Sequence, residues 1–324
     1  MTRVVVLPAL DAAQYQRSTL HAEDRVWVEK NCYIDIWIEV VHALGLDPLA
    51  MLGFTSAIDF EGDQWTFFKP PHEELRDLYG LDVQELNVWR SIAEHTIEYV
   101  GAGKMISTEA DAFWLPDTAG TDYQRTHTKT TIVIQDFDLE RQRMGYFHNA
   151  GYYALEGEDF RQLFRVGKAP DPTFMPLFAE AIRSDRMVKR PTAELRETAR
   201  RLLARHVGRR PADNPVVRFG KRFATDLPWV TEKGLPFYHA WAFATVRQLG
   251  AAMELLQLHL AWLDDPALLA AAEPFGKISA TAKAFILKAA RAVNAKRALD
   301  ASPMFDEMAQ AWQCGMDTLA AHLR

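Results

Sequence analysis

Residues 128–147 read TKTTIVIQDFDLERQRMGYF, and this stretch decides the fold class of the N-terminal half. The run Thr130–Ile134 is β-branched throughout, a composition that is enriched in strands. A short polar segment, Asp138–Arg143, separates it from a second apolar run that ends at Phe147. We therefore expect an antiparallel hairpin with strands at Thr128–Asp138 and Arg143–Phe147.

A buried helix is expected upstream of this hairpin, between Asn31 and Gly45. Asn31 is a good N-cap, and Gly45 stands where a C-terminal glycine belongs. The residues between them are apolar on most sides, which is typical of a helix inside a core. The remaining elements expected in this half are strands near Trp65–Phe68 and Ala112–Leu115 and helices at Val88–Val100 and Glu158–Phe164.

The C-terminal half has a different pattern, rich in Ala and punctuated by Pro and Gly, which predicts a mostly helical structure. Two prolines in the stretch 167–172 mark the boundary. We expect an α+β protein with domains at residues 1–168 and 169–324. Helices are expected at residues 173–184, 191–208, 237–263, 277–298 and 303–323.

The composition excludes several classes of protein. The chain has 324 residues, 48% hydrophobic and 25% charged, which is too apolar for a disordered chain. Two cysteines cannot make a disulfide scaffold. The first apolar run stops at Pro8, and the run 240–263 is broken by polar residues, so neither a signal peptide nor a membrane span is expected. We expect a soluble, cytoplasmic protein with reduced thiols.

No resident metal or cofactor is expected. The sequence has no Cys pair, no His-x3-His and no Glu-rich helical pairing of the kind that ligates zinc. The segment Gly101–Lys104 lacks the spacing and context of a phosphate-binding loop.

Cys32 is the first candidate for chemistry. If Asn31 caps the helix, Cys32 lies in the first turn, where backbone N–H groups and the helix dipole favour the thiolate. The thiolate is the form that attacks carbonyl carbons. The alternative is a small apolar residue in the core, which is what we expect of Cys314.

His127 is the second candidate, because it opens the first strand of the predicted hairpin. The second strand ends at Phe147 and returns beside the start of the first, which brings His148 or Asn149 near His127. A side chain there could accept the Nδ1–H of His127 and fix its tautomer. Asp136 is a weaker rival, since it lies about 30 Å along the same extended strand.

The order Cys, His at a strand start, then Asn or Asp is that of papain-like sites. The segment from Cys32 to Phe164 resembles the papain-like cysteine acyltransferases of the butirosin-biosynthesis N-terminal type, and more distantly the bacteriocin-processing cysteine peptidases. The whole chain also resembles a bacterial family of unknown function encoded beside amino acid:carrier protein ligases. The residues that carry the first likeness are Asn31–Tyr33, Asp111–Pro116, His127, Tyr146–Leu155 and Glu158–Phe160.

The resemblance implies a papain-like N-terminal half and a role for each residue. Cys32 would be the nucleophile, His127 the general base and acid, and Asn149 the residue that orients His127. That position usually holds Asp in the butirosin type, so His148 remains a rival for it. The backbone N–H of Cys32 and the Asn31 side chain would form the oxyanion hole. The glutamine that many papain-like enzymes carry before the cysteine is absent from residues 24–30.

A basic block indicates an acidic partner. Residues 183–222 contain 13 Lys+Arg against four Asp+Glu, a net charge of +9, so the rest of the chain carries −15. An acidic acyl carrier protein fits such a block, and the residues chosen for its docking are Arg200, Arg201, Arg205, Arg209 and Arg210. The alternative is a solvated helix face whose arginines pair with acids elsewhere. Nucleic acid is disfavoured, because the block lacks interleaved aromatic residues.

Together these features predict a cysteine-dependent acyl- or aminoacyltransferase. An acyl group would pass from a carrier-protein thioester, on its phosphopantetheine arm, to Cys32 and then to a small-molecule amine. One alternative is a papain-like cysteine hydrolase or peptidase, in which water resolves the acyl-enzyme. Another is a carrier-protein-binding protein without activity on a degenerate papain-like fold.

Overall fold

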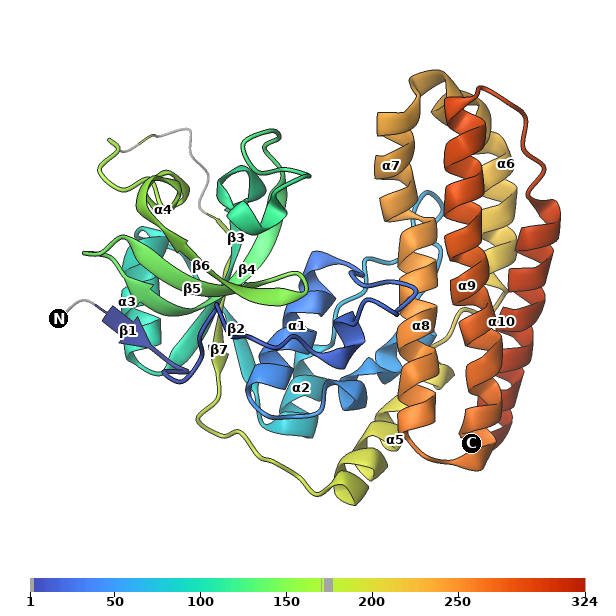
Figure 1. The fold of residues 1–324 in the computed structure, drawn as a ribbon. Coiled ribbons are helices and arrows are strands. Elements are labelled where there is room, and N and C mark those ends of the chain that lie inside the picture. Colours follow the sequence, from blue (N-terminus) through green and yellow to red (C-terminus); the bar gives the residue numbers. More distant parts are fainter. Residues whose placement is uncertain (1–2, 170, 172–176, 324) are drawn as a thin grey trace. The chain divides into compact units, whose positions relative to one another are not determined.

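The computed structural model describes residues 3–169, 171 and 177–323 and contains two compact units. The first unit holds an antiparallel sheet with its helices, and the second is helical, so the protein is of the α+β class (Figure 1). The two compact units do not meet at a single point in the sequence, because each is made of three separate segments. The first unit comprises residues 1–22, 32–47 and 75–189, and the second comprises residues 23–31, 48–74 and 190–324.

The sheet of the first unit is antiparallel throughout, in the order β2-β7-β3-β4-β5-β6, with β1 paired to β4. The predicted hairpin is confirmed as β4 and β5, which are joined by a short turn and interrupted by an irregularity at Gln135. The strands are β1 (Arg3–Val5), β2 (Asp82–Glu85), β3 (Lys104–Asp111), β4 (Lys129–Asp138), β5 (Arg143–His148), β6 (Gly151–Glu156) and β7 (Ala179–Arg183).

The two faces of this sheet are covered by different helices. On one face, Ile132 and Ile134 of β4 join a buried cluster with residues of α3 (Ile92–Gly101) and α4 (Gly157–Leu163). Helix α1 (Cys32–Ala43) packs against the other face of β4, β5 and β6. Because side chains alternate along a strand, β3 presents Ser107, Glu109 and Asp111 to the face covered by α1.

Helix α1 begins and ends where the sequence predicts. Its C-terminus closes in a Schellman motif, in which the N–H of Gly45 bonds to the carbonyl of His42 and that of Leu46 bonds to Val41. Gly45 has φ +70°, a conformation that glycine adopts without a steric penalty. The helix interior is almost wholly buried, as its apolar composition indicates.

The second unit is built on helices that pack along one another, with α8, α9 and α10 side by side (Figure 1). Residues 23–31 run into it, and Trp27 packs so closely on α8 that a Cβ at Gly250 would lie 2.5 Å from the indole. The helices are α5 (Thr192–Gly208), α6 (Pro215–Lys233), α7 (Leu235–Ala244), α8 (Val246–Trp262), α9 (Pro266–Asn294) and α10 (Ser302–His322). The short elements elsewhere are η1 (Thr19–His21), η2 (Pro48–Ala57), α2 (His72–Tyr79), η3 (Ala112–Trp114) and η4 (Pro116–Thr118).

Several expected elements differ in the structure. Ala112–Leu115 is not a strand, because Asp111 ends β3 by accepting the Phe113 N–H and so starts the 3-10 turn η3. Of the expected helix 173–184, residues 173–176 lie outside the described residues, and residues 179–183 form β7, paired on both sides. Near Trp65 only an isolated bridge to Phe60 forms.

In the second unit, the expected helix 237–263 is two helices. They are divided at Thr245, whose φ of −115° and ψ of −97° are not helical. The helix α6 was not predicted. Among the described residues, no helix is both long enough and apolar enough to cross a membrane.

Candidate functional site

The imidazole of His127 forms a carboxylate–histidine pair with Asp111. Its Nδ1 lies 2.6 Å from Asp111 Oδ2, and the other carboxylate oxygen, Oδ1, accepts the backbone N–H of Phe113 at 3.1 Å. Because an ionised carboxylate can only accept, the proton of a neutral His127 is at Nδ1 and its lone pair is at Nε2. The His127 side chain is 68% exposed, so this basic nitrogen is accessible.

The main chain around His127 is held by the end of β3. Asp111 lies opposite Lys129 in the β3–β4 ladder, and the N–H of Ala112 bonds to the carbonyl of Thr128. Phe113, in the turn that Asp111 starts, stacks on the imidazole. An aromatic face and a carboxylate therefore fix the plane of His127 from two directions.

Cys32 is a free, half-buried thiol in the first turn of α1, whereas Cys314, which was expected in the core, is exposed on α10. The next residue, Tyr33, donates its hydroxyl to Glu180 of β7 at 3.0 Å, and Glu180 lies opposite Ser107 of β3. Asp111 is four residues further along β3 on the same face, about 13 Å away. The first turn of α1 and the His127–Asp111 pair therefore lie over one face of the sheet.

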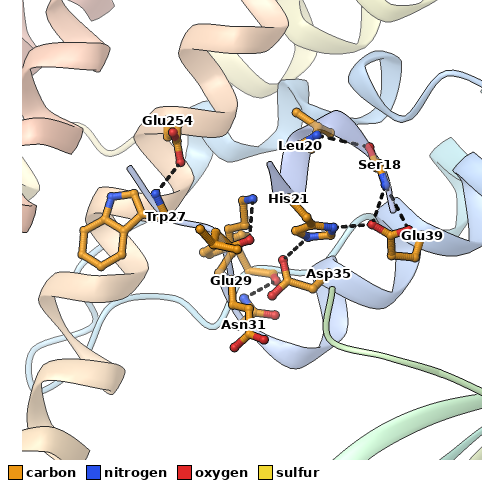
Figure 2. A network of polar contacts seen from close by, with 12 residues as sticks. Ser18, Leu20, His21, Trp27, Glu29, Asn31, Asp35, Glu39 and Glu254 are labelled. Carbon is orange, nitrogen blue, oxygen red and sulfur yellow. Dashed lines mark hydrogen bonds and ion pairs between the residues drawn. The ribbon is translucent and has the colours of Figure 1, made fainter. Parts of the chain in front are cut away.

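Helix α1 is anchored by a buried polar network, drawn in Figure 2. His21 lies between two carboxylates of α1, with Nε2 3.0 Å from Asp35 and Nδ1 against Glu39. Glu39 also accepts the Ser18 N–H at 3.0 Å and the Tyr15 hydroxyl at 2.5 Å. Both nitrogens of His21 therefore face carboxylates of α1. The network joins the N-terminal segment to α1 and so holds the helix that carries Cys32.

Two residues predicted from the sequence, Cys32 and His127, thus lie over the same face of the sheet. In the described part of the chain, no hydrogen bond links Cys32 Sγ to the imidazole of His127. The backbone N–H and the thiol of Cys32 remain as predicted, at the start of a helix, where anions are favoured.

The expected partner of His127, Asn149, is replaced by Asp111. Asn149 lies in the tight turn between β5 and β6, with φ +44°. Val133 of β4 pairs with Phe147 of β5. Counted from this pair towards the same end of the sheet, Asn149 is two residues away and His127 is six, so the two residues are separated by about 13 Å along the strands. Asp136, the weaker rival, makes a two-pronged ion pair with Arg3 at 2.9 and 2.7 Å.

His148 belongs to a separate buried network on the opposite face of the sheet. Its Nδ1 lies 2.5 Å from Asp117 and its Nε2 lies 2.8 Å from the Thr130 hydroxyl. Tyr146 donates its hydroxyl to the same Asp117, and burial and this carboxylate both raise the pKa of Tyr146. Both nitrogens of His148 are thereby engaged away from α1.

Asn31 is engaged inside the second unit. Its amide nitrogen donates to the carbonyl of Phe68 at 3.1 Å and to Gln248 Oε1 at 3.2 Å, and the residue is buried. The amide hydrogens that were expected to bind an oxyanion therefore have other acceptors. Of the two donors expected to form an oxyanion hole, the backbone N–H of Cys32 at the start of α1 is the one not contradicted by these contacts.

Much of the basic block is neutralised within the protein. Arg200 pairs with Asp265 and Arg205 with Glu74, while Arg210 donates to the carbonyl of Val207. The other arginines of the block in ion pairs are Arg183, Arg190, Arg196, Arg218 and Arg222. Arg201 of α5 and Arg209, the residue just past its end, are exposed, and Arg205 between them is exposed but paired with Glu74.

Over the residues that the structure describes, no three His, Cys, Asp or Glu side chains are grouped to hold a metal ion. The chemistry available on the α1 face of the sheet is that of a thiol, an imidazole and a carboxylate. This set defines a candidate nucleophile–base site on an α+β protein. The chain belongs to the DUF1839 family: residues 16–184 match the DUF1839 N-terminal domain, and residues 192–321 match the DUF1839 C-terminal domain. A comparison with curated proteins gives no match.

Proposed function

We propose that the protein is a cysteine-dependent acyl- or aminoacyltransferase of papain-like architecture, with Cys32 as nucleophile, His127 as base and Asp111 as the residue that orients it. The observation that carries the proposal is the His127–Asp111 pair, which leaves an exposed basic Nε2 on the sheet face that α1 covers. A positioned His–carboxylate pair is the arrangement that activates nucleophiles in acyl transfer.

The reaction has two halves. His127 Nε2 takes the thiol proton of Cys32, and the sulfur attacks the carbonyl carbon of a carrier-protein thioester. The C–S bond to the phosphopantetheine arm breaks, and the departing thiolate takes the proton from His127. An amine then attacks the Cys32 thioester, His127 accepts its proton, and the proton returns to Cys32 as the amide is released.

Two features at the start of α1, the Cys32 N–H and the helix dipole, favour the attack of Cys32 on the thioester. The negative oxygen of the tetrahedral intermediate would lie near the N-terminus of α1, where the Cys32 N–H and the helix dipole stabilise it. Nucleophile and base have to approach each other by loop or side-chain movement. Such contacts are often long in enzymes without substrate and tighten on binding.

The proposed docking surface for the carrier protein is formed by Arg201 of α5 and Arg209, the residue that follows its last turn. Acyl carrier proteins are acidic, so their charge is complementary to this surface. Exposed charges of this kind mainly accelerate encounter rather than tighten the complex. The cytoplasm, where thiols are kept reduced, is the proposed compartment, and both cysteines are free.

The test is to incubate the protein with aminoacylated carrier protein and to look for the added acyl mass on Cys32 by peptide mass spectrometry. Wild type should gain the mass, Cys32→Ala should not, and Cys314→Ala should behave as wild type. Transfer by Cys32→Ala at the wild-type rate would overturn the proposal. Free acid without any conjugate would instead identify a hydrolase.

A second candidate is a carrier-protein-binding protein without activity. The observation that favours it is the lack of a hydrogen bond between Cys32 and His127 among the described residues. It predicts that Cys32 reacts with iodoacetamide at the rate of an ordinary thiol and that His127→Ala does not change this rate. For the transferase, the His127→Ala variant should react more slowly than wild type.

A further inference from the structure

A cluster of cationic and aromatic residues lies around the start of α3, on the sheet face opposite α1. Trp89 is 74% exposed, and the guanidinium of Arg90 lies over its ring at 4.9 Å. Lys104 lies in the same way over Tyr99, 5.3 Å from the ring centroid. A large exposed indole with cations beside it is more typical of a binding surface than of ordinary protein surface that contacts only water.

Two cavities meet at this cluster and share Trp89 and Arg90 in their walls. The larger, about 530 Å³, lies between α3, β4 and the end of α4. The smaller, about 430 Å³, lies beside α3. Together they reach the size typical of small-molecule sites.

The smaller cavity is lined by a histidine without hydrogen-bond partners. His95 is only 2% exposed, and within the described part of the chain neither Nδ1 nor Nε2 has a partner. The ring instead meets Trp89 and Tyr99 at centroid distances of 6.1 Å each. Arg90 Nε is likewise buried without a partner, while Arg90 Nη2 lies 3.6 Å from Glu98, the carboxylate in the wall of the same cavity. Unpaired buried donors are costly, so their retention here points to a ligand that accepts from them.

The larger cavity has a different character. Its lining includes the apolar side chains Ile92, Ile132, Leu163 and Phe164, while Arg90, Arg165 and Lys168 supply positive charge. Two acidic residues contribute to its wall, and both are ion-paired. Glu109 is on the alternation of β3 that faces α1 and pairs with Lys129 at 3.4 Å, and Asp171 pairs with Arg165 at 3.5 Å. An apolar chamber next to unpaired donors fits a ligand with an apolar chain and a negative head.

We propose that these two cavities form one site for an amphipathic anion, a carboxylate or phosphate joined to an apolar chain. The anionic group accepts from His95 and Arg90, and the chain occupies the space between α3, β4 and α4. Burial and the nearby Arg90 both lower the pKa of His95, so the ring is neutral at pH 7 and offers one N–H. The site is separate from Cys32 and His127, which lie at the opposite face of the sheet.

The experiment is calorimetric titration of the full chain with four probes. Octanoate and octyl phosphate carry both an apolar chain and an anionic group, octanol carries the chain alone, and inorganic phosphate is the anionic group alone. Octanoate or octyl phosphate should bind at least tenfold more tightly than octanol and than inorganic phosphate, and whichever is tighter identifies the headgroup. Octanol binding as tightly as both anions would overturn the proposal, as would the absence of binding by either anion.

Two variants locate the site. His95→Phe and Arg90→Gln should each weaken binding of the preferred anion at least tenfold, while His322→Phe and Arg141→Gln, on exposed side chains elsewhere, should not. His95→Phe removes two unpaired buried nitrogens, so its thermal midpoint without ligand should equal or exceed that of wild type. The anion should then raise the thermal midpoint of wild type but not of His95→Phe. Unchanged affinity in both variants would refute the assignment.

Discussion

The imidazole of His127 lies nearly parallel to the ring of Phe113, with centroids 4.2 Å apart and an angle of 11° between the planes. Phe113 also donates its backbone N–H to the same Asp111 whose second oxygen meets His127. One turn of chain therefore supplies the stacking surface and orients the carboxylate. The imidazole is held in a single plane although most of its surface is exposed to solvent.

Replacing Asp111 by Asn should reduce acyl transfer about 10²-fold or more while leaving the fold intact. An amide has one oxygen for the two donors that Asp111 now serves. If that oxygen keeps the Phe113 N–H, the amide NH₂ faces His127 Nδ1 and moves the ring proton to Nε2. The measurement is the rate of Cys32 acylation.

The matched control is Asn149→Gly, which suits the positive φ at that turn. It should acylate at close to the wild-type rate. A large loss in this variant together with full activity of Asp111→Asn would restore Asn149 as the orienting residue and remove Asp111 from the site.

Phe113→Leu should slow transfer by about two- to tenfold, which corresponds to the 0.5–1.5 kcal/mol typical of an aromatic pair. Leucine keeps the apolar bulk but loses the flat surface on which His127 rests. The effect should fall on kcat rather than on KM, because Phe113 acts through His127 and not on the carrier protein. A change in KM alone would assign Phe113 to substrate binding.

Strong local signals in the sequence predicted the parts of the fold that depend on local chemistry. Asn31, Gly45 and the apolar residues between them predicted α1, and the β-branched run with its polar turn predicted β4 and β5. Helix α6 was missed because Pro228 lies inside it and arginines interrupt its apolar pattern. β7 was missed because residues 179–183 are helix-forming in composition and become a strand through pairing on both sides.

The candidate site was half visible in the sequence. Cys32 and His127 could be predicted because they stand at a helix start and before a strand. Asp111 does not, because it precedes His127 by sixteen residues, and only the β3–β4 register brings it there. A prediction that β3 runs to Asp111 and pairs with β4 would have found it. The sequence pattern favoured Ala112–Leu115 as the strand instead.

Reversing the two charges of the proposed docking surface, with Arg201→Glu and Arg209→Glu together, should lower the association rate with an acidic carrier protein at least fivefold at low salt. The difference should shrink as salt is raised, because exposed charges are screened. Surface plasmon resonance at two ionic strengths measures both effects. The control is the double variant Arg141→Glu and Arg161→Glu, on exposed residues of the first unit, which should associate normally.

Glu39→Gln should destabilise the protein by about 3 kcal/mol, the usual cost of breaking a buried ion pair. Glu39 is buried and serves His21, Ser18 and Tyr15 at once, and an amide cannot accept from all of them. Denaturant unfolding gives the difference. Glu158→Gln, on an exposed side chain, should change stability by less than about 0.5 kcal/mol. Equal effects from the two variants would show that the network contributes no net stability.

His259 should make stability depend on pH. Its ring is buried, with Nδ1 2.7 Å from the carbonyl of Leu49, and burial lowers its pKa to about 4. The unfolded chain protonates this residue near pH 6.5, so stability is full above that pH and falls as the pH drops towards 4. The loss attributable to His259 is roughly 3 kcal/mol. His259→Gln should flatten the stability profile between pH 6.5 and 4, and a profile parallel to that of wild type would exclude this role.

The segment around Trp27 has a consequence for the order in which the protein forms during synthesis. Glu254 of α8 accepts the backbone N–H groups of Val26 and Trp27, and the Trp27 indole donates to Ser279 of α9. The ribosome synthesises Trp27 long before either helix, so the indole has neither of these partners until the last third of the chain is translated. A gene fragment that begins at α5 would encode helices with an unfilled slot over Gly250. The C-terminal family domain, residues 192–321, is therefore smaller than the compact unit to which it belongs, which also contains residues 23–31 and 48–74.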